Sequence, residues 1–174
     1  EAWDSTAGLL ADWQYEDDLG WLIGGGLALL EPGPLGEMLL ASAAIGLTGR
    51  AATYAVLYGP LNPGPLSATV AASFRGGSYS EVAYAEVVRL YRVYGGRSSQ
   101  IGSYWSTTAP TGVLRSRIEL ALSPRWGNSA NQVVAIDVPA GVRMYEGIAA
   151  SQGGLVGGGT QVFVPSVNPA WIVP

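Results

Sequence analysis

The sequence of 174 residues contains no cysteine, no histidine and no lysine, so all nine of its basic residues are arginine. Without cysteine or histidine, a Ser-His-Asp triad, a Cys-His nucleophile and a zinc site with thiolate or imidazole ligands are excluded. Without lysine, the phosphate loop of nucleoside triphosphatases and the amine of Schiff-base enzymes are excluded as well. Any chemistry must use arginine, hydroxyl, amide and carboxylate groups, and we expect no metal.

The chain does contain enough apolar residues, 48% of the total, to bury a core, and its length suits one domain, or one domain plus a small helper. Its charge is uneven. Residues 1–74 carry eight acids and one arginine, a net charge of −7, whereas residues 75–174 carry eight arginines and five acids, a net charge of +3. This shift predicts two modules that divide at residue 74. The weak positive charge of the second module does not favour nucleic-acid binding, but it suits a small anionic ligand.

Residues 1–74 are typical of a small helical module. Helices are expected over residues 4–19, 51–58 and 66–74, and two apolar runs cover residues 19–30 and 35–47. Each apolar run has about a dozen residues, fewer than the roughly 20 that span a bilayer, so buried helices are favoured over a membrane-inserted hairpin. The chain opens on the acidic Glu1 without a basic leader, so we expect no signal peptide and a piece of a longer chain.

Residues 75–174 are typical of a compact, strand-dominated domain. β-Branched and aromatic runs between Gly, Pro and Asn turns predict strands over residues 82–84, 87–94, 133–138, 142–145 and 161–164. Residues 111–122 are predicted to be helical, because Leu114, Ile118 and Leu122 recur at intervals of four. The glycine-rich segments 95–103 and 153–159 are expected to be mobile loops, where sites often lie. The predicted fold class is α+β, a small helical module followed by a strand-dominated domain.

Three segments of this second module carry candidate chemistry, and the first contains Arg92 within an otherwise apolar and aromatic strand. A charge there must be paired or directed into a cleft. A guanidinium binds a diphosphate or a carboxylate in a two-pronged manner, but an ion pair with Glu86, Glu119 or Glu146 is an equally good explanation. Arg89 is the alternative arginine; strand alternation places it on the opposite face, so only one of the two can line a cleft.

The second segment is Ser103-Tyr104-Trp105-Ser106-Thr107-Thr108. Its rings could stack on a flat heterocycle and its hydroxyls could bind a ribose, whereas the alternative is an edge strand whose hydroxyls face water. The third segment is a glycine-rich loop from Gln152 that leads into a strand beginning near Gln161. Glycines allow the backbone to approach a ligand closely, although a flexible hairpin is the alternative. A strand and not a helix follows, which excludes the nucleotide-binding glycine fingerprint.

Taken in order, these segments resemble the ADP-ribosyltransferase toxin fold. That family carries an arginine in its first core strand, commonly after an aromatic residue, and Tyr91-Arg92 matches this element. It then carries a Ser-Thr-Ser-like strand, which Ser106-Thr107-Thr108 matches except at its last position. Its last element is a loop that leads to a catalytic glutamate at the start of a strand ending in proline.

The last element matches residues 160–165 with two changes. Gln161 occupies the place of the catalytic glutamate, and Gly159 occupies the place of an upstream loop acid. More widely, residues 72–174 resemble the C-terminal toxin domains of bacterial polymorphic toxins of the Rhs and contact-dependent inhibition types. The domain predicted over residues 75–174 is therefore ADP-ribosyltransferase-like, and residues 1–74 are compatible with the helical pre-toxin segments of such chains.

The resemblance implies that NAD+ is the substrate and that no metal is needed. The implied catalytic residues are Arg92, Ser106 and Gln161, and the implied substrate-binding residues are Tyr91, Tyr104, Trp105, Thr107 and Gly159. Arg92 would hold a phosphate of NAD+, Tyr104 or Trp105 would stack on nicotinamide, and Ser106 would fix the ribose or orient Gln161. The carbonyl of Gln161 would stabilise the positive charge that develops on the ribose.

The glutamine sets the expected reaction. It keeps a hydrogen-bonding carbonyl but loses the charge of a glutamate and any capacity to act as a base. Cleavage of the nicotinamide bond needs less help when the acceptor is water, and toxins resembling the tuberculosis necrotizing toxin hydrolyse NAD+ with such a glutamine. The resemblance therefore implies an NAD+ glycohydrolase, with ADP-ribosylation of a protein or RNA as the alternative.

As a toxin, the domain would belong to a larger delivery protein, would act in the cytoplasm of a target bacterial cell, and would require a cognate immunity protein that plugs its cleft. The non-enzymatic alternative is a β-rich binding module with Trp105 and Trp126 as ligand platforms. A nuclease is disfavoured, because the usual proton carriers and phosphate clamps are missing. Convergence of Arg92, Ser106 and Gln161 on one ligand would separate the enzyme from the binding module.

Overall fold

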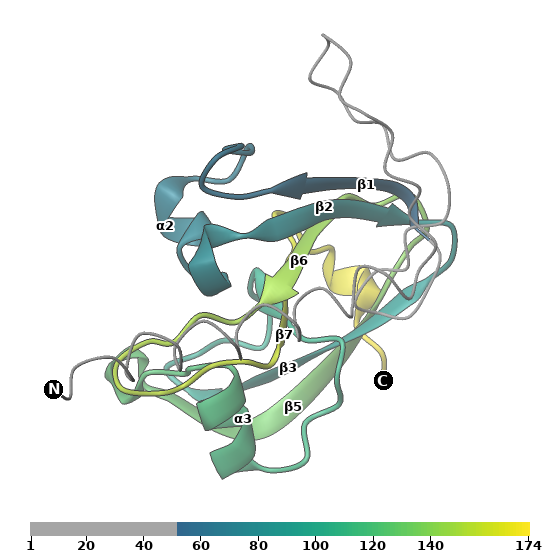
Figure 1. Cartoon of the computed structure of the whole chain (residues 1–174). Coiled ribbons are helices and arrows are strands. Elements are labelled where there is room, and N and C mark those ends of the chain that lie inside the picture. The colour runs from purple at the N-terminus through teal and green to yellow at the C-terminus, as the bar shows by residue number, and fades with distance from the viewer. Residues whose placement is uncertain (1–51) are drawn as a thin grey trace, which may run out of the picture. The chain divides into compact units, whose positions relative to one another are not determined.

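The computed structural model describes residues 52–174, whose strands form two antiparallel sheets. The larger sheet has the order β1-β2-β6-β7-β4, and the smaller pairs β3 with β5 (Figure 1). The strands are β1 Ala52–Tyr58, β2 Tyr79–Tyr84, β3 Val88–Gly96, β4 Tyr104–Trp105, β5 Asn128–Val138, β6 Met144–Ile148 and β7 Thr160–Phe163. The α-helices are α2 Ala68–Ala71 and α3 Val113–Glu119, and 3-10 turns lie at Arg75–Gly77, Pro124–Trp126 and Pro169–Trp171. This part of the chain confirms the strand-dominated α+β class.

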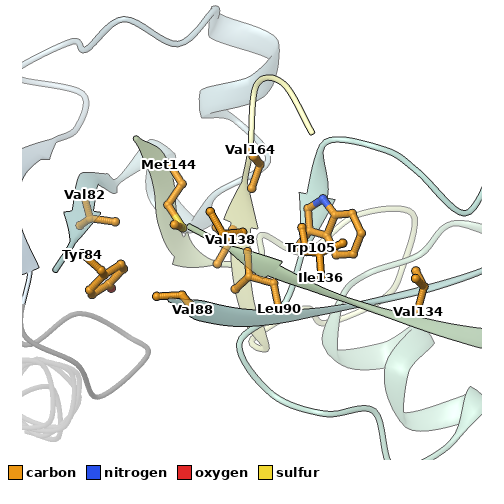
Figure 2. Close-up of a cluster of buried hydrophobic side chains, with 11 residues drawn as sticks. Val82, Tyr84, Val88, Leu90, Trp105, Val134, Ile136, Val138, Met144 and Val164 are labelled. Carbon is orange, nitrogen blue, oxygen red and sulfur yellow. The ribbon is translucent and has the colours of Figure 1, made fainter. Parts of the chain in front are cut away.

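The hydrophobic core lies between the two sheets. In β5, Val134, Ile136 and Val138 are buried and alternate with more exposed residues, the period of two expected for a strand with one face on the core. Figure 2 shows these side chains together with Met144 of the larger sheet and Trp105 of its edge strand. Trp105 is only 2% exposed, so the edge strand is anchored by one of the largest side chains of the core.

The first strand corrects one prediction. The sequence predicts a helix over residues 51–58, but Ala52–Tyr58 forms β1 and pairs antiparallel with β2. The segment contains β-branched and aromatic residues that suit a strand, namely Thr53, Tyr54, Val56 and Tyr58. Its pairing with β2 outweighs the helix propensity of the alanines between them. The larger sheet thus contains residues from both sides of the division predicted at residue 74. The predicted helix over residues 4–19 and the two apolar runs lie outside the described residues.

Helix α3 confirms the prediction of a helix within residues 111–122, although it is shorter and buries a different face. Leu114 and Ile118 are exposed, whereas the buried side chain is Ser116, whose hydroxyl donates to the Gly112 carbonyl at 2.8 Å. The interval of four therefore marks the helix but not its buried face. Within residues 52–174, no helix is long and apolar enough to cross a membrane.

Candidate functional site

A cavity of about 680 Å³ lies where the two sheets meet, within the size range of small-molecule sites. The sheets are joined there by Tyr91 of β3 and Ser106, which exchange two backbone hydrogen bonds of 2.8 Å. The walls come from β3, the edge strand β4, the start of β7, the α2 segment and the turn before β5. The residues of interest on these walls are Ser73, Tyr91, Arg92, Trp126, Gln152 and Gln161.

Arg92 brings an uncompensated positive charge to this cavity. Its guanidinium donates to the Tyr104 carbonyl at 2.9 Å, to Ser98 Oγ at 3.2 Å and to the Ser99 carbonyl at 3.4 Å. All three acceptors are neutral, and no carboxylate of residues 52–174 forms an ion pair with it. Burial lowers the pKa of Arg92, yet an arginine stays protonated at neutral pH. The guanidinium is held in place and its charge remains available to an anion.

The ion pairs elsewhere decide against the structural explanation of Arg92. Glu119 binds Arg115 at 2.6 Å, and Glu146 accepts a hydrogen bond of 2.7 Å from the Tyr84 hydroxyl. Neither of them, nor Glu86, forms an ion pair with Arg92. The structural ion pair, which the sequence allowed as an explanation of Arg92, is therefore absent among the described residues. The geometry supports the other explanation, an arginine directed into a cleft.

Two further arginines lie close to the rim of the cavity. The Arg97 guanidinium donates to the Arg125 carbonyl at 3.1 Å, and its backbone N–H donates to the Gly127 carbonyl at 2.9 Å. Neither arginine forms an ion pair within the part of the chain that the structure describes. Trp126 lies between Arg125 and Gly127, lines the cavity and is 51% exposed. The rim thus combines positive charge with an accessible indole ring.

Gln161 faces the same cavity from the start of β7, with its amide held in one orientation. Its Nε2 donates to the Ser73 carbonyl at 3.1 Å and to Ser73 Oγ at 2.9 Å. Among residues 52–174, no buried side-chain oxygen or nitrogen lacks a hydrogen-bond partner, and Gln161 Oε1 accepts no hydrogen bond. That oxygen must therefore be accessible, and the space next to it is the cavity that Gln161 lines.

Ser106 is buried beside this cavity and belongs to a cluster of hydroxyls centred on Thr160. Thr160 Oγ1 lies 2.9 Å from Ser106 Oγ and accepts from the Thr107 hydroxyl at 2.8 Å and the Thr107 N–H at 3.2 Å. Ser106 Oγ also accepts from the Thr108 N–H at 3.1 Å. These bonds fasten the end of the edge strand to the residue before Gln161. None of them reaches the Gln161 side chain, so the role expected of Ser106 stays a prediction.

A second cavity of about 230 Å³ adjoins the first. The two share Tyr91, Val93 and Leu120 as walls, and Ser106 and Gly159 line the second cavity but not the first. The Gly159 N–H donates to the Glu119 carbonyl at 2.8 Å, so it is already engaged. The structure therefore brings Arg92, Tyr91 and Gln161 to one cavity and places Ser106 and Gly159 in the neighbouring one.

The two aromatic residues of the edge strand have different surroundings. Trp105 contributes to the cavity wall, but it is buried in the core and its Nε1 donates to the Gly102 carbonyl at 2.7 Å. Tyr104 is 38% exposed, and its ring packs edge-on against Phe163 at 5.3 Å. A ligand platform at Trp105 is therefore not available without displacing core contacts, whereas the Trp126 indole is already open to the cavity.

Sequence reasoning missed Ser73 and Thr160 as parts of this region. Thr160 had only a weak local signal, its place next to Gln161, because consecutive side chains of a strand point to opposite faces. Ser73 had none, since 88 residues separate it from Gln161. Within residues 52–174, no group of three or more acidic side chains is placed to hold a metal ion.

No family model matches this chain, and neither does any curated protein. One solved structure, described as "Structure of Tne2 in complex with Tni2", is similar to it with a TM-score of 0.46 and 15% sequence identity. The likeness covers 54% of this chain and 86% of that chain.

Proposed function

We propose that this chain is an NAD+ glycohydrolase, which binds NAD+ in the larger cavity and transfers its ADP-ribose to water. One observation carries the proposal: the unpaired guanidinium of Arg92 and the accessible amide oxygen of Gln161 line one cavity. The guanidinium suits the diphosphate of a dinucleotide, and the amide oxygen suits the positive charge that develops when the nicotinamide bond breaks.

Binding would depend on three features of the cavity. Arg92 holds a phosphate through charge-assisted hydrogen bonds, and its fixed guanidinium loses little freedom when the ligand arrives. Trp126 offers a flat apolar face to the adenine or the nicotinamide ring. Arg97 and Arg125 raise the positive potential near the rim, which attracts an anionic substrate. Trp105, which is buried in the core, adds an apolar wall to the cavity.

The chemistry needs neither a base nor a metal. The bond between the anomeric ribose carbon and the nicotinamide nitrogen breaks, and nicotinamide leaves with the electron pair. The oxygen of a water molecule bonds to the same carbon, and one proton is released to solvent. The Gln161 carbonyl dipole, directed at the ribose, stabilises the oxocarbenium-like transition state because it is preorganised and does not have to turn during the reaction.

The second cavity favours ADP-ribosyl transfer as the alternative function. It adjoins the first through Tyr91 and Leu120, so it could hold part of an acceptor beside the reacting carbon. With a glutamine at position 161, no carboxylate there would activate such an acceptor. Transfer to a poor nucleophile is therefore the weaker proposal of the two.

As in the toxins that the sequence resembles, we further propose that the domain is delivered by a larger protein into the cytoplasm of a target bacterium. Consumption of NAD+ there would deplete a cofactor that the producing cell also needs. A cognate immunity protein is thus part of the proposal. By covering the rim around Trp126, it would block access of NAD+ to Arg92.

The test is NAD+ consumption by the purified chain with no added acceptor, followed by product analysis and proton release. Nicotinamide and free ADP-ribose in equal amounts, with one proton for each NAD+, support the glycohydrolase. Label transfer from NAD+ to components of a bacterial lysate, with little free ADP-ribose, would support the transferase instead. If NAD+ is lost in neither assay, the proposed function is wrong.

A further inference from the structure

Ser73 is buried and lies after helix α2, which is capped at its start by Ser67, whose hydroxyl oxygen accepts from the Val70 N–H. Its hydroxyl donates to the Val70 carbonyl at 2.6 Å, a bond within its own segment. Its backbone carbonyl accepts from the Ala150 N–H at 2.9 Å as well as from Gln161. Both oxygens of Ser73 are thus fixed by the fold, and both are turned towards the Gln161 amide.

The direction of these bonds follows from simple proton counting. A backbone carbonyl only accepts, and the single proton of the Ser73 hydroxyl is used by the Val70 carbonyl. Ser73 therefore offers Gln161 two acceptors and no donor. The Gln161 amide therefore turns its NH₂ group, which donates, towards the two Ser73 oxygens. Its own oxygen then points away from Ser73. The orientation of the Gln161 amide is determined by Ser73 and not by the ligand.

We infer that Ser73 is a positioning residue that directs the Gln161 oxygen into the cavity and makes position 161 specific for an amide. This inference rests on the proposed function and adds a residue from the segment that the sequence assigned to a helper module. A carboxylate at position 161 would meet two acceptor oxygens at hydrogen-bond distance, which is unfavourable unless the carboxyl is protonated. The glutamine is thus required by its surroundings, and a glutamate cannot replace it.

The kinetic test compares S73A with a matched control, S116A. Each substitution removes one buried serine hydroxyl that donates to a carbonyl of its own segment, at 2.6 Å for Ser73 and 2.8 Å for Ser116. With NAD+ as substrate, S73A is expected to lower kcat about tenfold or more with KM within about twofold, because a small misplacement of a reacting group is costly. S73T, which keeps the hydroxyl, is expected to recover most of the kcat. Equal kcat values for S73A and S116A would overturn the inference.

The amide specificity is tested with Q161E and Q161A. We expect Q161E to lose kcat at pH 7.5 at least as severely as Q161A, although a carboxylate would stabilise positive charge better than an amide does. Wild-type or higher kcat in Q161E would show that a carboxylate is accepted at this position. Each variant is also melted thermally, so that a loss of kcat caused by misfolding is recognised.

A stability measurement separates this inference from the proposed function. Because the two Ser73 oxygens favour the protonated form, the carboxyl of Q161E has a higher pKa folded than unfolded, and its protonated state stabilises the fold. Its Tm should match the wild type below about pH 4.3 and fall below it, by about 5 °C or more, as the pH rises to 8. The charged groups on the surrounding elements are Arg92, Arg75 and Arg115, which oppose this shift, and Glu119 and Glu146, which add to it.

The outcomes are therefore distinct. A wild-type chain that does not consume NAD+, together with a pH-dependent loss of Tm in Q161E, would end the proposed function but support the amide-specific contact. A Q161E variant with the same Tm difference from wild type at pH 4 and pH 8 would overturn the contact, whatever the activity. The variants S73A and S116A are melted in parallel, and similar Tm values show that a difference in kcat is not a difference in folding.

Discussion

Arg89 and Asp137 lie directly opposite each other on β3 and β5 and form a two-pronged ion pair, with N–O distances of 2.8 and 2.7 Å. The pair is exposed, and the Arg89 bond lowers the pKa of Asp137. Arg92, on the opposite face of the same strand, has only neutral partners and lines the cavity. One strand thus carries one neutralised arginine and one that is open to a ligand, which makes the two a matched pair for mutagenesis.

Replacing Arg92 with alanine is expected to raise the KM for NAD+ by about 10- to 100-fold, since hydrogen bonds to charged groups contribute about 1.5–3 kcal/mol. Initial rates of NAD+ loss over a range of concentrations give this value. R89A is the control, and its KM should stay within about twofold of wild type because its ion pair lies at the surface. An R92A protein that folds and keeps the wild-type KM would remove Arg92 from the binding site.

Replacing Trp126 with alanine is expected to raise the KM for NAD+ by about 5- to 100-fold, because stacking of a base on an aromatic ring contributes about 1–3 kcal/mol. W126F keeps a flat ring and should retain most of the affinity. Because Trp126 is half exposed, neither substitution should lower the Tm appreciably. Identical KM values for W126A and wild type would mean that the ligand does not touch this ring.

Trp105 is expected to behave as a core residue. W105A should lower the free energy of unfolding by about 3–5 kcal/mol, the usual cost of truncating a buried aromatic side chain. Urea unfolding followed by circular dichroism measures this change. A W105A protein of wild-type stability with a raised KM would show instead that the ring is a ligand platform, as the sequence alone allowed.

The protein is expected to lose stability in alkali as the pH rises above 10. Burial, with a further contribution from the charge of Glu81, raises the pKa of Tyr145, and the same causes raise the pKa of Tyr58. The folded state then holds protons that the unfolded state releases, so the free energy of unfolding falls as pH rises through 10 towards the folded pKa. Melting curves from pH 8 to 11 test this, and Y145F should show a smaller decline than the wild type. An equal decline would rule out Tyr145 as a cause.

The sequence predicts best where a strand buries one face. The β-branched run over residues 133–138 predicts a strand, and this range lies within β5. In β5, Val134, Ile136 and Val138 are buried and alternate with more exposed residues. The prediction fails at β1, because its conformation is set by pairing with β2 residues that lie 21 to 32 positions further along the chain, and local alanine content favours a helix. A local sequence pattern does not show which distant strand a segment will pair with.

The same limit applies to the candidate site. Residue types identify Arg92 and Gln161 as candidates, since a buried arginine and a polar residue after a glycine loop both need a reason. They do not reveal that Ser73 holds the amide, because that contact joins segments 88 residues apart. Nor does composition distinguish a buried indole from an open one: Trp105 is 2% exposed and Trp126 is 51% exposed.

The pairing of β1 with β2 determines how short a working fragment of this protein can be. A fragment that starts at residue 75, where the charge composition changes, would lack both β1 and Ser73. The β2 strand would then become a bare edge with unpaired backbone groups, and Tyr79 would lose its ring contact with Tyr58 at 5.5 Å. Such an edge is a template for other chains, so this fragment should aggregate even with Arg92 and Gln161 intact. A soluble fragment that keeps this edge paired has to include β1 from Ala52 onward.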